Sequence, residues 1–68
     1  MKTVSIVVPC YNEEENVEPL AEALRKLFQT SLQGYGYEII FIDNDSKDRT
    51  RDIIRKLGGQ DKNIKGIF

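Results

Sequence analysis

The sequence predicts an α/β protein whose strands and helices alternate as β-α-β-α-β around a parallel sheet. Two runs rich in β-branched residues, at 3–9 and 38–42, are each followed by polar residues and then by a helical pattern of apolar residues. A third apolar run begins at residue 63. Strands joined through helices run parallel, with right-handed crossovers. The predicted strand order is therefore 3-2-1, with both helices on one face of the sheet.

The first strand, at residues 3–9, is predicted to end at Pro9. Pro19 would break a helix that began at residue 12. It falls instead in the first turn of a helix whose N-cap is Asn16, where a missing N–H costs nothing. Glutamates 13–15 then stay in the preceding loop. The apolar face of this helix repeats with the helical period and comprises Val17, Leu20, Ala21, Leu24, Leu27 and Phe28.

Gly34 and Gly36 mark the turn before the second strand, which is apolar on both faces at residues 38–42. Parallel strands are normally covered on both faces. With both helices on one face, residues 39–42 leave apolar side chains without a partner on the other. We therefore expect residues 1–68 to be the N-terminal portion of a larger domain, incomplete by themselves.

The second helix is predicted to be capped by Asp45 or Ser46 and to end at the glycine pair 58–59. Asp48 would complement its dipole. Its inward residues are Ile53, Ile54 and Leu57. The third strand is expected at residues 63–68.

Composition narrows the classes of function. The chain has 68 residues, 40% hydrophobic and 31% charged, with a net charge of −1. Lys and Arg are spread along the chain, which disfavours nucleic acid as a partner. No apolar run approaches the roughly 20 residues that span a bilayer, and residues 1–3 lead into a strand without a secretory signal. A single cysteine excludes an internal disulfide and fits a reducing compartment.

Polar side chains follow both strands at the point where each strand ends. Tyr11 and Glu13 follow the first strand, and Asp43, Asn44 and Asp45 follow the second. In open α/β sheets, ligands bind beyond the carboxyl ends of parallel strands. Carboxylates there can accept hydrogen bonds from a base or a ribose, and a carboxylate pair can bind Mg²⁺ or Mn²⁺. The sequence thus predicts a nucleotide-type site at this edge.

Each candidate also has a structural interpretation. We interpret Asp45, Ser46 and Asp48 mainly as helix caps, and Asp43 as a ligand contact because it precedes any cap position. Tyr11 can stack on a base or pack on the neighbouring loop. Of the three glutamates 13–15, only Glu13 is near enough to the strand to contact a ligand.

Several further chemistries are disfavoured. The chain has no histidine, so Cys10 is interpreted as a small buried hydrophobic residue and not as a catalytic thiol. No glycine-rich phosphate loop follows the first strand, which disfavours a dinucleotide-binding Rossmann domain or a P-loop. A phosphate site on the second helix is disfavoured as well. Its basic residues are expected on its solvated face; they are Arg49, Arg51, Arg55 and Lys56.

Residues 4–20 and 37–50 together resemble the opening of family 2 glycosyltransferases, which have the GT-A, Rossmann-like fold. Within that family, the resemblance is to the dolichol-phosphate mannosyltransferase and bactoprenol glucosyltransferase group, and it covers essentially the whole chain. It implies that Pro9, Tyr11 and Glu13 line a nucleoside site. It also implies that Asp43, with Asn44 and Asp45, holds the base or ribose. Family members usually have Asp-Asp-Gly-Ser where this chain has residues 43–46.

The resemblance further implies a transferase that moves a sugar from a nucleotide-diphospho sugar to an acceptor, often a polyprenyl phosphate. Such enzymes use Mg²⁺ or Mn²⁺, whose ligands are expected after a later strand, as are the acceptor site, the catalytic base and any membrane anchor. The expected location is cytoplasmic, at the cytoplasmic face of the membrane of the cell envelope. Further expected partners are the remainder of the same domain and a second copy of the chain. Residues 1–68 alone are expected to be inactive.

Two alternatives compete with this interpretation. In a phosphatase of the haloacid dehalogenase type, Asp43 would be the nucleophile and Asp45 the acid, but that loop normally follows the first strand of its domain. A non-catalytic nucleotide-binding module is the other alternative. It would need polar residues or a partner on the open face of the sheet.

Overall fold

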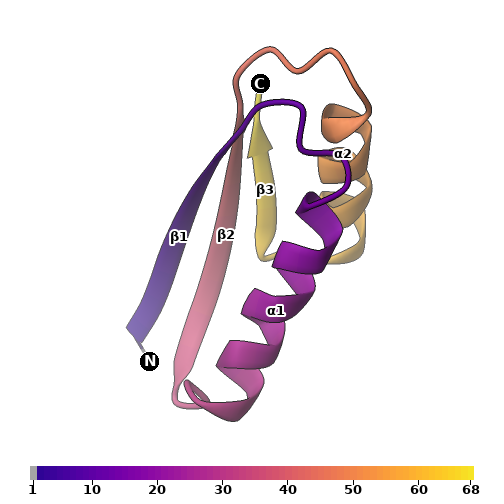
Figure 1. Ribbon diagram of the computed structural model, residues 1–68. Helices are drawn as coiled ribbons and strands as arrows, with labels where there is room; N and C mark the ends of the chain where they lie inside the picture. Colours follow the sequence, from indigo (N-terminus) through magenta and orange to yellow (C-terminus); the bar gives the residue numbers. More distant parts are fainter. Residues whose placement is uncertain (1) are drawn as a thin grey trace.

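The computed structural model describes residues 2–68 and contains all five predicted elements in the predicted order (Figure 1). The elements are β1 (Lys2–Cys10), α1 (Val17–Thr30), β2 (Tyr35–Asp43), α2 (Thr50–Gln60) and β3 (Ile64–Ile67). The three strands form one parallel sheet in the order β1-β2-β3, with β2 in the centre. This is the predicted order, read from the opposite edge.

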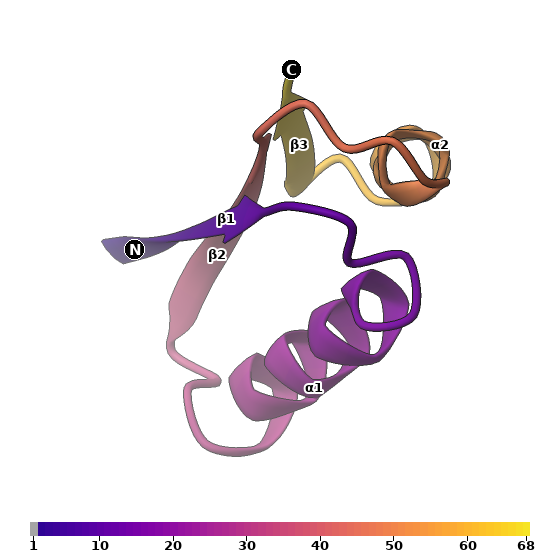
Figure 2. The same ribbon diagram turned by 45° about the horizontal axis from the view of Figure 1, so that its top comes forward.

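Both helices pack on the same face of the sheet, as predicted (Figure 2). Burial alternates along β2 accordingly. Ile39 and Phe41 are completely buried beneath the helices, whereas Ile42, on the other face, is 37% exposed. The core between sheet and helices is one cluster that comprises Cys10, Val17, Ala21, Ile39, Phe41, Ile54, Leu57 and Ile64.

The start of α1 follows the prediction, with Asn16 at the N-cap position and Pro19 in the first turn. The Asn16 side chain does not cap the helix, however. Its amide donates a hydrogen bond to Glu13 Oε2 at 2.7 Å. The predicted apolar face is only partly buried, because Leu20 and Leu27 are 38% and 43% exposed at its margins.

Several predicted boundaries were wrong. Pro9 lies inside β1, which continues to Cys10; a proline is tolerated there because β1 is an edge strand among residues 2–68 and its outer N–H groups need no ladder partner. Gly36 lies inside β2 and not in the preceding turn. The glycine pair 58–59 lies inside α2, because neither residue adopts the positive φ that ends a helix.

The prediction that Asp45 or Ser46 caps the second helix was also wrong. α2 begins only at Thr50, with Arg49 at the N-cap position, and the Arg49 side chain makes no capping hydrogen bond within residues 2–68. Asp48 remains close to the helix start, where its Oδ1 accepts the Thr50 N–H at 2.9 Å. Residues 44–49 therefore form a loop in which the side chains of Asp45 and Ser46 make other contacts.

The open face of the sheet is apolar toward the carboxyl ends of the strands and polar elsewhere. Val7 and Ile67 are each 55% exposed on this face. Closer to the amino ends of the strands, Glu38 accepts hydrogen bonds from Ser5 Oγ at 3.1 Å and from Lys65 Nζ at 2.7 Å. The predicted unpartnered apolar face is thus confirmed for one half of the sheet, while the other half carries a polar row that the sequence did not indicate.

Candidate functional site

The ends of β1 and β2 lie side by side, which brings the two predicted parts of the site together. The strands are adjacent and parallel, and Cys10 pairs with Asp43 at the end of their ladder. The Asn44 N–H donates to the Cys10 carbonyl oxygen at 2.8 Å. The prediction that Tyr11 and Asp43 share one edge of the sheet is therefore confirmed.

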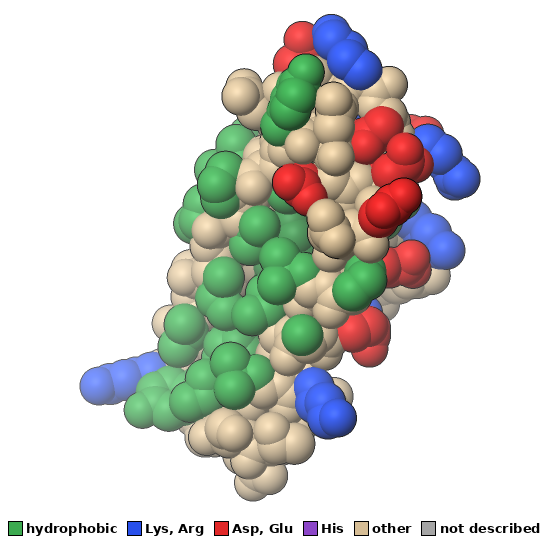
Figure 3. Space-filling model, viewed as in Figure 1, with side chains coloured by type: hydrophobic (Ala, Val, Ile, Leu, Met, Phe, Trp, Pro, Cys, Tyr) green, Lys and Arg blue, Asp and Glu red, His purple; other side chains and the backbone are tan. Residues whose placement is uncertain are grey.

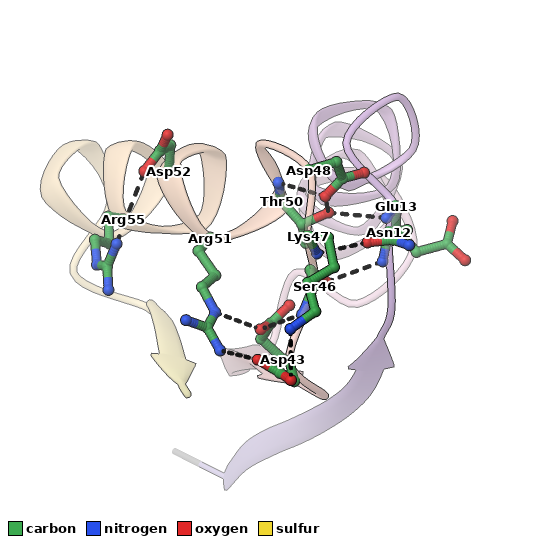
Figure 4. Close-up of polar contacts among 11 residues, drawn as sticks. Asn12, Glu13, Asp43, Ser46, Lys47, Asp48, Thr50, Arg51, Asp52 and Arg55 are labelled. Atoms are coloured by element: carbon green, nitrogen blue, oxygen red, sulfur yellow. Dashed lines mark hydrogen bonds and ion pairs between the residues drawn. The ribbon is translucent and has the colours of Figure 1, made fainter.

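Asp43 is a buried carboxylate that carries a charge. Its side chain has no exposed surface, and its Oδ2 accepts hydrogen bonds from Arg51 Nε at 2.7 Å and from the Ser46 N–H at 3.0 Å (Figure 4). Burial alone would raise the pKa of Asp43, but the Arg51 and Ser46 contacts outweigh it and lower the pKa to about 2. Its other oxygen, Oδ1, is buried without a hydrogen-bond partner among residues 2–68.

Arg51 joins the site, although the sequence placed it on the solvated face of the second helix. That prediction was wrong for this residue. From the first turn of α2 its guanidinium reaches back to Asp43, and one terminal nitrogen also lies 3.2 Å from Asp45 Oδ1. The contact with Asp43 raises the pKa of Arg51. Periodicity could not reveal this pairing, because it depends on the path of residues 44–49.

The other predicted site residues differ in accessibility. Tyr11 is 54% exposed immediately after β1, and Pro9, Asn44 and Asp45 are also exposed, whereas Glu13 is partly buried. Asp45 has a φ of 60°, which lies in the left-handed region that favours glycine. Glycine is the usual residue at this position in the Asp-Asp-Gly-Ser sequence of the family that the chain resembles.

Asp45 is also held by its neighbours. Its Oδ2 accepts a hydrogen bond from Lys47 Nζ at 2.9 Å, and this contact lowers its pKa. The side chain nevertheless remains on the surface of the loop, so it can exchange Lys47 for another donor without loss of burial.

A cleft of about 230 Å³ opens beside the end of β1. Its lining includes Pro9, Cys10 and Glu13, together with Val17 and Leu20 of α1. Hydrophobic side chains gather along β1 and the adjoining side of α1, and acidic side chains gather near the start of α1 (Figure 3). The cleft therefore has an apolar wall and an acidic rim.

The two loops that bear the site are joined by hydrogen bonds to Ser46, which was predicted to be a helix cap, and to Thr50, the first residue of α2. Ser46 accepts the Asn12 N–H at 2.9 Å, and Thr50 accepts the Glu13 N–H at 2.8 Å (Figure 4). Thr50 was not a predicted site residue. The Ser-x-Asp-x-Thr spacing gave a signal, but the same spacing suits an ordinary helix start.

The residues at this edge do not fit a divalent metal ion. Asp43 is already neutralised by Arg51, and residues 2–68 contain no group of three or more histidine, cysteine, aspartate or glutamate side chains that could hold one.

Within residues 2–68, neither helix is long and apolar enough to cross a membrane.

A parallel α/β sheet with exposed polar side chains at its carboxyl edge is the arrangement of a nucleotide-binding domain. The chain belongs to glycosyl transferase family 2, whose family model matches residues 5–68. The GT-A, Rossmann-like fold that the resemblance implied is that of this family.

Several curated proteins are similar to the chain. A dolichol-phosphate mannosyltransferase of Pyrococcus furiosus is 40% identical over 57 residues, which are 84% of this chain and 15% of the relative. A prophage bactoprenol glucosyl transferase homolog of Escherichia coli is 40% identical over 58 residues, 85% of this chain and 18% of the relative. A putative glycosyltransferase of Bacillus subtilis, CsbB, is 39% identical over 64 residues, 94% of this chain and 19% of the relative. The chain thus spans less than a fifth of the length of these relatives. No solved structure matches the chain significantly.

The family assignment leaves the phosphatase alternative without support.

Proposed function

We propose that this chain supplies part of the nucleoside site of a glycosyltransferase whose donor is a nucleotide-diphospho sugar. The observation that carries the proposal is the meeting of Tyr11, Asn44 and Asp45 at the carboxyl edge of two adjacent parallel strands in a member of glycosyl transferase family 2. Ligands of open α/β sheets bind at this edge.

The site residues have distinct roles in this proposal. Tyr11 stacks on the base, and such stacking is worth about 1–3 kcal/mol. Asn44 and Asp45, which are exposed, accept hydrogen bonds from the base or the ribose. The unpartnered Oδ1 of Asp43 accepts a further hydrogen bond from the ligand. Pro9 and Glu13 form the wall of the adjoining cleft.

We propose a polyprenyl phosphate as the acceptor, at the cytoplasmic face of a membrane. The support is in the names of the relatives, which include a dolichol-phosphate mannosyltransferase and a bactoprenol glucosyl transferase homolog. A divalent cation, Mg²⁺ or Mn²⁺, would bind the diphosphate through residues other than 2–68, since the carboxylates here do not form a metal site. We therefore also propose that residues 1–68 transfer no sugar by themselves.

The test is calorimetric titration of the complete polypeptide with a nucleotide-diphospho sugar and with the free nucleoside diphosphate. Asp43→Ala should weaken the binding of both ligands by a similar factor, about 10- to 150-fold, because both ligands contain the base and the ribose. Asp52→Ala is the matched control, since Asp52 is exposed on α2 and, among residues 2–68, pairs only with Arg55, at 3.8 Å. It should bind as the wild type does.

Repeating the titrations in excess EDTA separates a nucleoside contact from a metal ligand. If the deficit of Asp43→Ala persists without metal, the residue acts on the nucleoside. If the deficit disappears in EDTA, Asp43 is a metal ligand and the assignment is wrong. Equal affinities of Asp43→Ala and wild type under both conditions would leave Asp43 with a structural role only.

A further inference from the structure

We propose that Thr50, together with Ser46 and Asp48, positions the loop after β1 so that it can bind the nucleotide. Three side chains that follow β2, two from the loop of residues 44–49 and one from the first residue of α2, hold three successive backbone N–H groups of the loop after β1. This proposal rests on the proposed function, because it concerns how that site is kept in its binding conformation.

The first contact lies at Asn12. Its N–H donates to Ser46 Oγ at 2.9 Å, and its own Oδ1 accepts the Lys47 N–H at 2.8 Å, so the two loops bind each other reciprocally (Figure 4). Asn12 has a φ of 50°, in the left-handed region that asparagine enters more readily than most residues other than glycine. The hydrogen bonds with Ser46 and Lys47 hold the backbone in this conformation.

The next two N–H groups continue the pattern. The Glu13 N–H donates to Thr50 Oγ1 at 2.8 Å, and the Glu14 N–H donates to Asp48 Oδ2 at 3.3 Å. The hydrogen bonds from Thr50 and Glu14 also lower the pKa of Asp48 against the effect of its burial, so the carboxylate stays charged. Each of these side chains follows β2 in the sequence, yet each holds a backbone group that follows β1.

Thr50 is the centre of this arrangement. It has no exposed surface, and its hydroxyl both accepts the Glu13 N–H and donates to Asp48 Oδ1. The same Asp48 oxygen accepts the Thr50 N–H at the start of α2. One hydroxyl group therefore links the first turn of a helix to the loop that carries Tyr11 and Glu13. A methyl group of the same size could make neither bond.

Positioning of the loop after β1 is expected to affect the affinity for the nucleotide. If only a fraction of the molecules hold the loop in its binding conformation, the apparent dissociation constant rises by the inverse of that fraction. Loss of the Thr50 hydroxyl should therefore weaken nucleotide binding in protein that is still folded. A residue that only supports the fold would instead reduce the amount of protein able to bind, and leave the affinity of the folded molecules unchanged.

The experiment compares Thr50→Val with Thr50→Ser in the complete polypeptide. Each is titrated calorimetrically with uridine diphosphate and with guanosine diphosphate, in the presence of Mg²⁺, and the diphosphate that the wild type binds is the probe. We expect Thr50→Val to raise the dissociation constant roughly 5- to 100-fold at unchanged stoichiometry, as loss of one or two buried hydrogen bonds predicts. Thr50→Ser keeps the hydroxyl and should stay within about threefold of the wild type.

Two further variants complete the test. Thr30→Val removes a hydroxyl of the same kind, which bonds the Lys26 carbonyl oxygen at the far end of α1, and should not change the affinity. Ser46→Ala removes the contact to the Asn12 N–H and should also weaken binding; it carries the test if Thr50→Val does not fold. Unchanged affinity in Thr50→Val, or in Ser46→Ala where Thr50→Val does not fold, overturns the proposal and leaves the proposed function standing. A lower stoichiometry at unchanged affinity also overturns the proposal and leaves the proposed function standing. A wild type that binds neither diphosphate overturns the proposed function and this inference with it.

Discussion

At the scale of single residues, Asp43 shows how a buried charge is accommodated at the end of a strand. A buried carboxylate is costly unless it is paired and hydrogen-bonded. The Arg51 guanidinium and the Ser46 N–H meet this requirement through one carboxylate oxygen, Oδ2. The pair also fixes the first turn of α2 against the end of β2, so the ionisation of Asp43 is linked to the stability of the fold.

This linkage predicts how stability depends on pH. The pKa of Asp43 is about 2 in the folded chain, below the value of roughly 3.9 of an unfolded chain. The ionised form therefore stabilises the fold above about pH 4, and this contribution is lost as the pH falls from about 4 to 2. Asp43→Asn should be less stable than the wild type at pH 7, and the difference should shrink across that window. Urea denaturation at a series of pH values measures it; a constant difference between pH 7 and pH 2 would contradict the prediction.

Cys10 provides a second prediction at this scale. Its side chain is 4% exposed, and burial, with Glu13 and Asp43 nearby, raises the pKa of the thiol. Since the thiolate is the reactive form, native Cys10 should react with a thiol reagent much more slowly than the denatured chain does. A matched control is Ala23→Cys in a Cys10→Ser background, because position 23 is exposed on α1. Rapid labelling of native Cys10 would show that the thiol is accessible.

At the scale of elements, the close packing of β3 on α2 sets a strict limit on side-chain size. A methyl group at Gly66 would lie 2.6 Å from Ile54 Cγ2 and 2.9 Å from the Phe68 ring. Gly58, on α2, likewise faces the Ile64 carbonyl oxygen at 3.3 Å. Gly58, which the sequence suggested as part of a helix terminator, therefore allows β3 to approach α2 closely.

Gly66→Ala should accordingly destabilise the fold by about 1–3 kcal/mol, the range typical of overpacking. Gly59→Ala is the matched control, because nothing lies within 4 Å of a methyl group there and the residue is helical. That substitution should stabilise the chain by up to about 1 kcal/mol. Chemical denaturation of the two variants tests the prediction, which fails if Gly66→Ala is as stable as the wild type.

At the scale of the whole molecule, the sheet is covered by helices on one face only. Val7, Ile42 and Ile67 place exposed apolar side chains on the other face, near the carboxyl ends of the strands. Contiguous exposed apolar surface promotes association and binds apolar dyes. The polar row formed by Ser5, Glu38 and Lys65 limits this surface to part of the sheet.

Replacing Val7, Ile42 and Ile67 together by threonine should reduce dye fluorescence and self-association of the 68-residue chain. Its far-UV circular dichroism should not change, because threonine suits strands as well as these residues do. Leu27→Thr, at an exposed position of α1, is the control and should have a smaller effect. Undiminished dye binding by the triple variant would mean that the apolar surface responsible lies elsewhere.

The sequence by itself determined the order of elements, the parallel sheet, the shared face of the helices and the edge at which the candidate site lies. These follow from local periodicity and from the handedness of crossovers, which depend on residues close in the chain. Tertiary structure alone decided that Arg51 pairs with Asp43, that Ser46 holds the backbone of residue 12 instead of capping α2, and that Thr50 holds the backbone of residue 13. A serine, threonine or aspartate near a helix start can bind any nearby N–H, and only the folded path of the loops fixes which one it binds.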